Sequence, residues 1–403
     1  MKPPFKFEIL AKDKHSRART GIIHTKHGKL ETPYLVPVAT RGFIIALTKK
    51  EINQLKIPAM LSNTYHLHFM PPGDKEIKKL GGLHRVMQFP RVLFTDSGGF
   101  QALSLGIGRV RNMKKIGFFH ERKDIDEKDK KESFAEMTEK GIIFKSTYDE
   151  RISRFMGPRE SMEIQSNLGS DIIMAFDQCN CAGDTKKETE EAMLRSHKWE
   201  LESLKYHNKD QMLYGIVHGG AFKDLRIKSA KFISELPFDG IAVGGSWGKT
   251  NKDLYKVLSW IMPLLPEEKP RHLLGSGWVE DIFNAVEQGI DTFDCVETSR
   301  IARHRHLYIS PKSGGNIKNK FKIKVNQSNF NSNKKIDPIC QCPTCKKYTR
   351  KQLYTILLKD KREYYKHATV HNIGFMLQLT KDIRESIKQG NFQKLKKRWI
   401  KEL

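Results

Sequence analysis

The sequence predicts an α/β protein, a (β/α)8 barrel of the TIM type with an additional subdomain near its C-terminus. Eight short apolar runs alternate with longer stretches of helical length over the first three quarters of the chain. The runs are almost continuously apolar, which is typical of strands that are covered on both faces in a parallel sheet. The 403 residues are enough for one large barrel with insertions.

The eight expected strands are residues 34–38, 59–62, 92–95, 171–176, 214–217, 240–244, 272–275 and 292–296. Between them, residues 187–205, 223–236 and 279–288 have the length and pattern of helices. An open doubly wound sheet is the alternative, but no Gly-x-Gly-x-x-Gly motif follows an early strand. The alternation of strands and helices therefore favours the closed barrel.

Two segments interrupt this order. Residues 109–131 are densely charged and predict an inserted loop, and residues 310–333 are rich in Ser, Gly, Asn and Lys and predict a mobile loop. A helix is expected over residues 372–388, with Gly390 as its stop. The expected division is a barrel over 1–310, a metal-binding subdomain over 311–371 and a segment over 372–403 whose helix packs on the barrel.

The composition narrows the possible partners. Lys and Arg number 72 against 46 acidic residues, a formal charge of +26, which favours polyanions such as nucleic acids. A solvated lysine-rich surface is an equally simple explanation of the charge alone. The N-terminus lacks the apolar core of a secretory signal, and no apolar run reaches the roughly 20 residues of a membrane span. We expect a cytoplasmic protein without a membrane partner.

The cysteines predict a structural zinc site. Cys340, Cys342 and Cys345 lie within six residues, in a chain with only six cysteines, and His371 follows 26 residues later. Three thiolates and one imidazole complete a tetrahedral zinc shell without an open position. Incidental cysteines, or His367 as the fourth ligand, are the alternatives. We expect one zinc ion that stabilises the final loop and helix and does not activate water.

Carboxylates at strand ends predict the reactive site. In a barrel the C-terminal strand ends converge, which would bring together Asp96, Asp177, His218, the Gly244-Gly245 pair and Asp294. Glycines beside these acids allow a planar ligand to approach the backbone closely, and an Asp can accept the donors of a purine edge. A single Asp after a strand is more often a helix N-cap. Three such acids beside glycine pairs favour a binding site.

Two carboxyl groups beside one sugar suggest glycosidic chemistry. A nucleophilic carboxylate can attack the anomeric carbon while a second carboxyl group handles the proton of the leaving group. On a nucleoside this breaks the N-glycosidic bond and leaves a covalent sugar–enzyme ester. If water is excluded, another base attacks the ester and the outcome is exchange instead of hydrolysis. Arg300 and Arg303, just after Asp294, suit phosphates or bases.

An ordered set of motifs resembles the tRNA-guanine transglycosylase (queuine tRNA-ribosyltransferase) family over residues 5 to 395. The set comprises Asp96-Ser-Gly-Gly-Phe-Gln101, Met174-Ala-Phe-Asp177, Ala242-Val-Gly-Gly245, Phe293-Asp-Cys-Val296 with Arg300 and Arg303, the Cys340/Cys342/Cys345 set and His371-Asn372. The resemblance implies exchange of the wobble guanine (position 34) in GUN-anticodon tRNAs (Asp, Asn, His and Tyr) for a 7-deazaguanine. By its length the chain resembles the bacterial type, and a homodimer is expected.

The resemblance also implies roles for individual residues. It makes Asp294 the nucleophile on C1′ and Asp96 the general acid and base. It implies that the base binds in a pocket in which Phe100 stacks on the ring. The pocket residues are Ser97, Phe100, Asp177, His218, Gly244 and Gly245. Arg300 and Arg303 are expected to hold the uridines that flank the target, and the four zinc ligands match the family.

The chain departs from the family pattern at three places. His218 stands where the family often has Gln, Lys249 stands where an acid is common, and residues 109–131 are inserted. An acid would suit the aminomethyl cation of preQ1, so Lys249 suggests queuine or another altered deazaguanine. The insertion is either an additional tRNA contact or a solvated loop, and we favour the loop.

Two other functions compete with an active transferase. A non-catalytic subunit of a heterodimeric transglycosylase would use the same fold, but the presence of both Asp96 and Asp294 argues against it. A zinc-stabilised barrel hydrolase of free nucleosides is the second, and the paired arginines and high charge argue for a larger RNA substrate.

Overall fold

The computed structural model describes residues 5–107, 132–248 and 250–400. The expected insertion at 109–131 and Lys249 therefore lie outside the described residues. Within the described residues no helix is both long and apolar enough to cross a membrane.

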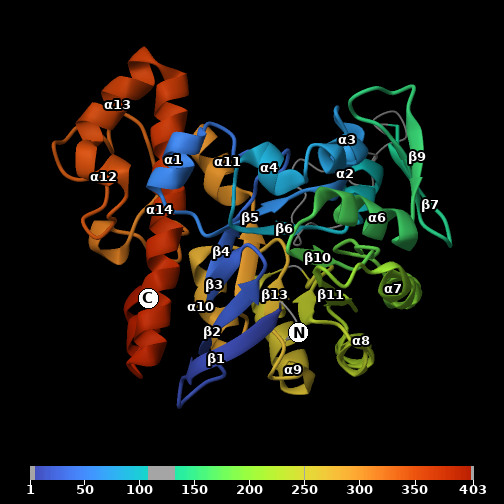
Figure 1. Cartoon of the computed structure of the whole chain (residues 1–403). Coiled ribbons are helices and arrows are strands. Elements are labelled where there is room, and N and C mark those ends of the chain that lie inside the picture. The colour runs from blue at the N-terminus through green and yellow to red at the C-terminus, as the bar shows by residue number, and fades with distance from the viewer. Residues whose placement is uncertain (1–4, 108–131, 249, 401–403) are drawn as a thin grey trace.

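Eight parallel strands form the centre of the molecule and confirm the predicted barrel (Figure 1). They follow the order β4-β14-β13-β12-β11-β10-β6-β5, and a parallel bridge between Val38 and Leu61 joins the two ends. The Ala39 N–H also donates to the Leu61 carbonyl at 2.7 Å. The strands are β4 (Tyr34–Pro37), β5 (Ala59–Ser62), β6 (Val92–Thr95), β10 (Ile172–Met174), β11 (Met212–Val217), β12 (Gly240–Val243), β13 (Arg271–Leu273) and β14 (Thr292–Cys295).

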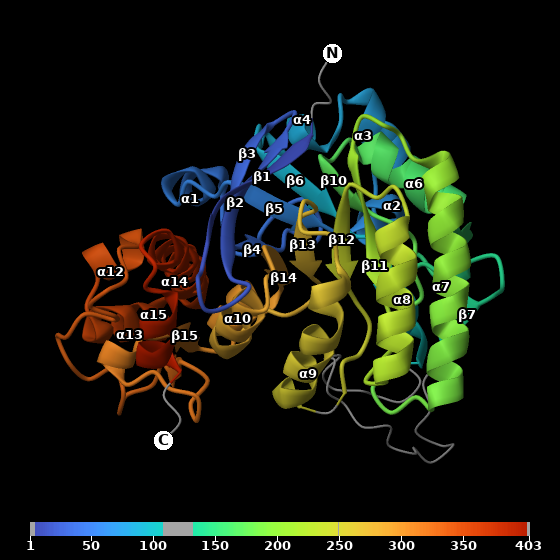
Figure 2. The same cartoon turned by 90° about the horizontal axis from the view of Figure 1, so that it is seen from below.

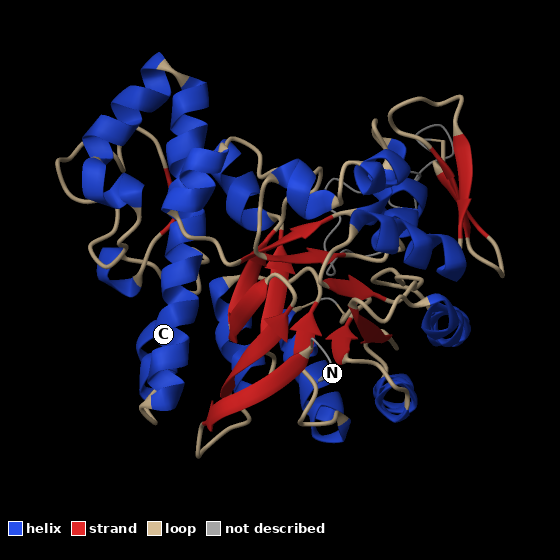
Figure 3. Cartoon of the chain, viewed as in Figure 1, coloured by secondary structure: helices blue, strands red, loops and turns tan. Residues whose placement is uncertain are grey.

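Helices surround these strands (Figure 3). The predicted helices appear as α7 (Lys186–Tyr206), α8 (Lys223–Glu235) and α10 (Val279–Glu287), with α6 (Pro158–Leu168) and α9 (Asn251–Ile261) beside them. Helix α7 begins with a capping box at Thr185. The Thr185 side chain accepts a hydrogen bond from the Glu188 N–H, and the Glu188 carboxylate accepts one from the Thr185 N–H. Shorter helical segments on the first part of the chain are α1 (Lys49–Gln54), α2 (Thr64–Phe69), α3 (Asp74–Lys79), α4 (Leu83–Met87) and η1 (Ala102–Ile107), and η3 (Met262–Leu264) follows α9.

Two three-stranded antiparallel sheets outside the barrel were not predicted. The first contains β1 (Lys6–Lys12), β2 (Arg19–Thr25) and β3 (Gly28–Thr32), and the second contains β7 (Ala135–Met137), β8 (Ile142–Lys145) and β9 (Ser153–Met156). Polar and exposed residues recur along these strands. They therefore lack the continuous apolar runs that identified the barrel strands.

The C-terminal elements gather on one side of the barrel (Figure 2). They are α11 (Glu297–Arg303), β15 (His306–Tyr308), η4 (Pro311–Ser313), β16 (Lys322–Lys324), α12 (Pro343–Lys347), α13 (Arg350–Lys359), α14 (Lys361–Lys388) and α15 (Phe392–Trp399). Helix α14 contacts α11, β15 and β4. It begins at Lys361 and not at the predicted residue 372, because the Asp360 side chain caps the N–H groups of Arg362 and Glu363. The division at 310 and 371 remains a prediction.

Candidate active site and metal centre

Asp294 lies within the last strand of the barrel, β14, and one of its oxygens is held in place. Its Oδ1 atom accepts a hydrogen bond from the Gly275 N–H at 2.9 Å and lies 3.2 Å from His272 Nε2. His272 Nδ1 lies 2.8 Å from Thr292 Oγ1, so the imidazole is fixed at both nitrogens. No hydrogen-bond partner of Asp294 Oδ2 is present among the described residues. The arrangement orients one carboxylate oxygen and leaves the second available to a substrate.

Asp96 follows β6 directly and is held by the residues after β5. The Thr64 N–H donates to Asp96 Oδ1 at 2.9 Å, and Asn63 Nδ2 donates to Oδ2. Enclosure by the protein is the main cause that raises the pKa of Asp96 to about 7; the negative charge of Asp294 adds to this effect, and the hydrogen bonds oppose it. At neutral pH this carboxyl group is present in both protonation states, as a group that both donates and accepts a proton requires.

Asp177 lies three residues after β10 and is almost completely buried. The Ser97 hydroxyl donates to Asp177 Oδ1 at 2.6 Å, and His218 Nε2 lies 3.2 Å from Asp177 Oδ2. Ser97 Oγ also accepts from the Gly99 N–H at 3.0 Å. Three residues of the predicted base pocket (Ser97, Asp177 and His218) thus come together at the ends of β6, β10 and β11.

Glycines allow the turns after the strands to approach one another. A Cβ atom on Gly99 would collide with the Asp177 carbonyl, and one on Gly245 would lie 2.5 Å from Asn180 Oδ1 and 3.2 Å from His218 Nδ1. Gly245 also has φ +72°, a conformation that favours glycine. The Gly244-Gly245 turn therefore lies directly beside His218, as the sequence predicted.

The remaining predicted contact residues lie near these groups in the chain. Phe100 is partly exposed and begins the short helical segment after Gly99. Arg300 and Arg303 lie on α11, which begins three residues after Asp294. Arg300 is exposed, while Arg303 is half-buried and its pKa is lowered by burial and by the nearby Arg300 charge. Both arginines are close in sequence to Asp294, the candidate nucleophile, because α11 directly follows the strand that contains it.

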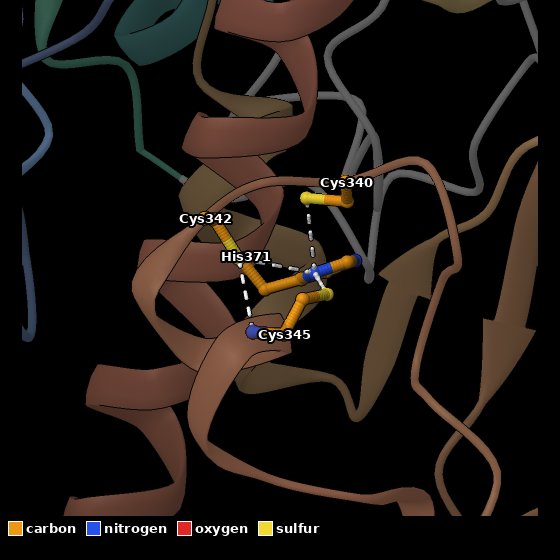
Figure 4. Close-up of side chains that lie close together, drawn as sticks. All are labelled: Cys340, Cys342, Cys345 and His371. Atoms are coloured by element: carbon orange, nitrogen blue, oxygen red, sulfur yellow. Dashed lines mark hydrogen bonds between the residues drawn. The ribbon is translucent and has the colours of Figure 1, made fainter.

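The four predicted metal ligands come together in one buried cluster (Figure 4). His371 Nδ1 lies 3.8, 3.6 and 3.1 Å from the sulfur atoms of Cys340, Cys342 and Cys345. A tetrahedral zinc ion with ordinary Zn–S and Zn–N bonds requires sulfur–nitrogen separations of about 3.5 Å, so the ligand set fits that ion. His371 Nε2 lies 2.8 Å from the Tyr308 carbonyl, which leaves Nδ1 for the metal.

The alternative ligand His367 lies outside this cluster. Its Nε2 atom is 3.0 Å from Glu363 Oε1, and its ring packs against Tyr348. All six cysteines are free of disulfides. The structure thus favours His371 over His367 as the fourth ligand.

Three contributors to the site were missed in the sequence. His272 was included in an expected strand without a function, although a histidine within an apolar strand is an available signal. Its pairing with Thr292 appears only in the strand register. Asn63 and Thr64 follow β5 and hold Asp96, but nothing in a single sequence pairs residues 63 and 96. Long-range pairs of this kind become visible only when the strand order is known.

The fold and the site define a class of enzyme: a (β/α)8 barrel with carboxylates at its strand ends and a Cys3His metal centre at its side. The family model for queuine tRNA-ribosyltransferase matches residues 13–403. A putative queuine tRNA-ribosyltransferase of Archaeoglobus fulgidus is 44% identical over 98% of this chain and 99% of its own length. Queuine tRNA-ribosyltransferases of Roseiflexus sp. and Clostridium perfringens are 36% and 37% identical over 98% of both chains.

The chain belongs to the queuine tRNA-ribosyltransferase family. It is accordingly a pentosyltransferase, with the tRNA-guanine transglycosylase activity of its family, and it serves tRNA modification in the queuosine system. The enzymes of this family act on tRNA and a deazaguanine base. The resemblance inferred from the motifs is confirmed.

Proposed function

We propose that this enzyme exchanges guanine at the wobble position of GUN-anticodon tRNAs for a 7-deazaguanine through a covalent aspartyl-ribosyl intermediate. The observation that carries the proposal is the fixed orientation of Asp294, whose Oδ1 is held by Gly275 and His272. A carboxylate with one bound oxygen can present the other to C1′ of the ribose. No ATP or redox cofactor is needed, because one glycosidic bond replaces another.

In the first half-reaction, Asp294 Oδ2 attacks C1′ and forms an ester, while the bond from C1′ to the guanine nitrogen breaks. The bond electrons go to guanine, which takes its proton from protonated Asp96. In the second half-reaction Asp96, now a carboxylate, removes a proton from the incoming base. The base then attacks C1′ and releases Asp294. The pKa of about 7 supports Asp96 in both roles.

Asp177 and the turn at Gly245 are proposed to bind the base. Asp177 is buried and retains contacts to Ser97 and His218, which supports recognition of a purine edge instead of a proton-transfer role. Phe100 is proposed to stack on the base. The proposal of queuine as incoming base, in preference to preQ1, rests on Lys249, which lies outside the described residues.

A cationic tract beside α11 supports tRNA as the substrate. Residues 298–336 contain no Asp or Glu, and among them only Lys322 lies within 4.0 Å of a described carboxylate, that of Glu297. Lys320 and Lys322 also lie over the Trp278 ring, at 4.3 and 5.3 Å from its centre. The ten cations of this tract are Arg300, Arg303, Arg305, Lys312, Lys318, Lys320, Lys322, Lys324, Lys334 and Lys335.

Cations without acidic partners attract phosphates by releasing counterions. We therefore propose that the anticodon arm lies along α11 and the β15–β16 hairpin, with Arg300 and Arg303 next to the flanking uridines. The tRNAs are those for Asp, Asn, His and Tyr. Zinc in the Cys3His centre is proposed as structural. The homodimer and the cytoplasmic location are proposals that rest on the family.

The test is release of labelled guanine from a tRNA-Asp or tRNA-Tyr transcript, chased separately with queuine, preQ1 and guanine. We expect exchange by the wild-type chain, and trapping of a covalent tRNA–protein adduct when the incoming base is withheld. Asp294→Asn should lower exchange by at least roughly 10³-fold while tRNA binding persists. Binding of tRNA without exchange of any base would refute the transferase and favour a non-catalytic subunit. Better exchange with preQ1 than with queuine would refute only the proposed base choice.

A further inference from the structure

Arg226 is a fully buried arginine next to the base-binding turns. It lies on the first turn of α8, and its guanidinium donates four hydrogen bonds, all to backbone carbonyls. Nε donates to Gly220 at 2.7 Å, and Nη1 donates to Val217 and Gly244 at 2.8 and 2.9 Å. Nη2 donates to Ser246 at 2.9 Å. One side chain therefore connects the turn after β11 with the turn after β12.

This cation has no acidic partner. Among the described residues no carboxylate lies within 4.0 Å of Arg226, in contrast to the buried Arg19, which pairs with Asp291 at 2.6 Å. Burial lowers the pKa of Arg226 to about 9, so the group still carries its charge at neutral pH. A buried, unpaired charge is costly. Four carbonyl dipoles compensate it here, and the same four bonds fix the peptide groups that supply them.

The direction of one amide follows from these bonds. In a trans peptide the C=O and N–H groups point in opposite directions. The Gly244 carbonyl points to Arg226, so the N–H of Gly245 in the same peptide group points away from it. Gly245 is buried, and its N–H has no hydrogen-bond partner among the described residues. The following N–H, of Ser246, is already bound to Asn180 Oδ1 at 3.3 Å.

The same guanidinium also fixes the position of His218. It binds the carbonyls of Val217 and Gly220, the residues on either side of the His218-Gly219 pair. His218 in turn lies 3.2 Å from Asp177, and the open N–H of Gly245 belongs to the turn beside it. Arg226 therefore sets the distance between the His218 side chain and the Gly245 amide.

We infer that Arg226 is the positioning residue of the base pocket: it holds the Gly244 carbonyl so that the Gly245 N–H donates to the ring carbonyl of guanine or its 7-deaza analogue. The inference rests on the proposed function, since it assigns this pocket to the base. Arg226 itself touches neither the base nor the reacting atoms. Its loss should therefore weaken binding of the base and leave tRNA binding intact.

A matched control is available in Arg271, on β13. This arginine is also buried and donates through Nη2 to two backbone carbonyls, those of Leu265 at 2.8 Å and Pro266 at 3.2 Å. It lies at the beginning of its strand, at the opposite end of the barrel from the strand-end pocket. Arg226→Lys and Arg271→Lys keep the charge and each lose part of the carbonyl contacts, but only the first should affect the base.

The experiment compares both variants with the wild-type holoenzyme in guanine exchange and, without tRNA, in guanine binding by calorimetry. For Arg226→Lys we expect the KM and the Kd for guanine to rise tenfold or more, with the KM for tRNA within twofold of wild type. For Arg271→Lys we expect a similar drop in melting temperature and unchanged constants for guanine. Arg226→Gln, which retains two N–H donors without the charge, is the second variant.

Each outcome bears on the inference. Guanine constants that remain at the wild-type value in Arg226→Lys, or that rise equally in both lysine variants, overturn it, as does failure of both Arg226 variants to fold when Arg271→Lys folds. Guanine binding is measured without tRNA, so the inference is tested even if the wild-type chain exchanges no base. That result would refute the proposed function and leave the role of Arg226 in guanine binding to be decided by calorimetry.

Discussion

Replacement of Asp96 by asparagine should change how the stability of the protein depends on pH. The folded protein holds the proton of Asp96 up to a pKa of about 7, whereas the unfolded chain releases it near the ordinary pKa of 3.8. Between these two values the folded state binds more protons than the unfolded state. Stability therefore falls as pH rises through this window. The side-chain amide of the Asp96→Asn variant does not titrate, so the variant lacks this loss.

The size of the effect follows from the two pKa values. Between pH 5 and pH 8.5 the wild-type chain should lose about 2.7 kcal/mol of unfolding free energy relative to Asp96→Asn, at about 1.3 kcal/mol per pH unit from pH 5 to pH 6 and about half that rate at pH 7. The variant also loses one hydrogen bond, because its amide meets the Asn63 amide that donated to Asp96. That cost of roughly 1 kcal/mol does not depend on pH and cancels when two pH values are compared.

The assay is denaturant unfolding of both proteins at pH 5 and at pH 8.5, with zinc present throughout. Titration of the cysteine ligands affects both proteins equally and is removed by subtraction. As pH rises, the free energy of unfolding of the variant should increase relative to that of the wild type. The variant should no longer exchange bases. Parallel stability curves for the two proteins, with differences that agree within about 0.5 kcal/mol, would show that Asp96 has an ordinary pKa and would refute its assignment as acid and base.

Three further predictions concern other parts of the site. His272→Ala removes one of two donors to the Asp294 carboxylate, so kcat should fall roughly 10- to 100-fold, as a charged hydrogen bond is worth about 1.5–3 kcal/mol. Cys345→Ser should lower zinc content in metal analysis and lower the melting temperature, because metal binding contributes to folding. Lys320→Ala combined with Lys324→Ala should reduce the slope of log Kd for tRNA against log salt by about 1.4, if each side chain contacts one phosphate.

Each of these variants has its own control. His272→Gln retains a donor and should recover part of kcat; equal rates for Gln and Ala would argue against a hydrogen-bonding role. A Cys345→Ser protein that keeps full zinc content would exclude this ligand set. For the lysine pair, Lys14→Ala and Lys29→Ala are far away in sequence and should leave the salt slope unchanged. An unchanged salt slope in the Lys320 and Lys324 variant would show that tRNA does not contact the β15–β16 hairpin.

The barrel could be predicted from the sequence because its strands are buried on both faces. Residues 59–62 and 92–95 are continuously apolar or small, and the structure has strands with the same bounds. The strands β1 and β9 could not be found in this way, since exposed residues recur along both. Helix α14 starts in a polar stretch, Lys361 to His367, and the apolar spacing that marks a helix begins only later.

The site shows the same limit. Asp96 and Asp177 follow strands and Asp294 lies near the end of one, so the rule that strand ends converge was enough to group them. His272 and Arg226 act through partners that are far away in sequence or are backbone carbonyls. A single sequence contains no information on such partners. Every residue has a backbone carbonyl, so the sequence cannot show which carbonyl a side chain binds.

The hydrogen bonds of the candidate metal ligand His371 and its neighbour Asn372 link the Cys3His centre to α11, the helix proposed to contact tRNA. His371 Nε2 binds the Tyr308 carbonyl, and the next residue, Asn372, accepts from the Tyr308 N–H and donates to the carbonyls of Thr298 and His306. Thr298 lies in α11, two residues before Arg300. A chain deprived of zinc should therefore lose affinity for tRNA before it loses affinity for the free base. The supply of zinc would then control the binding of tRNA, separately from the chemistry proposed at Asp294.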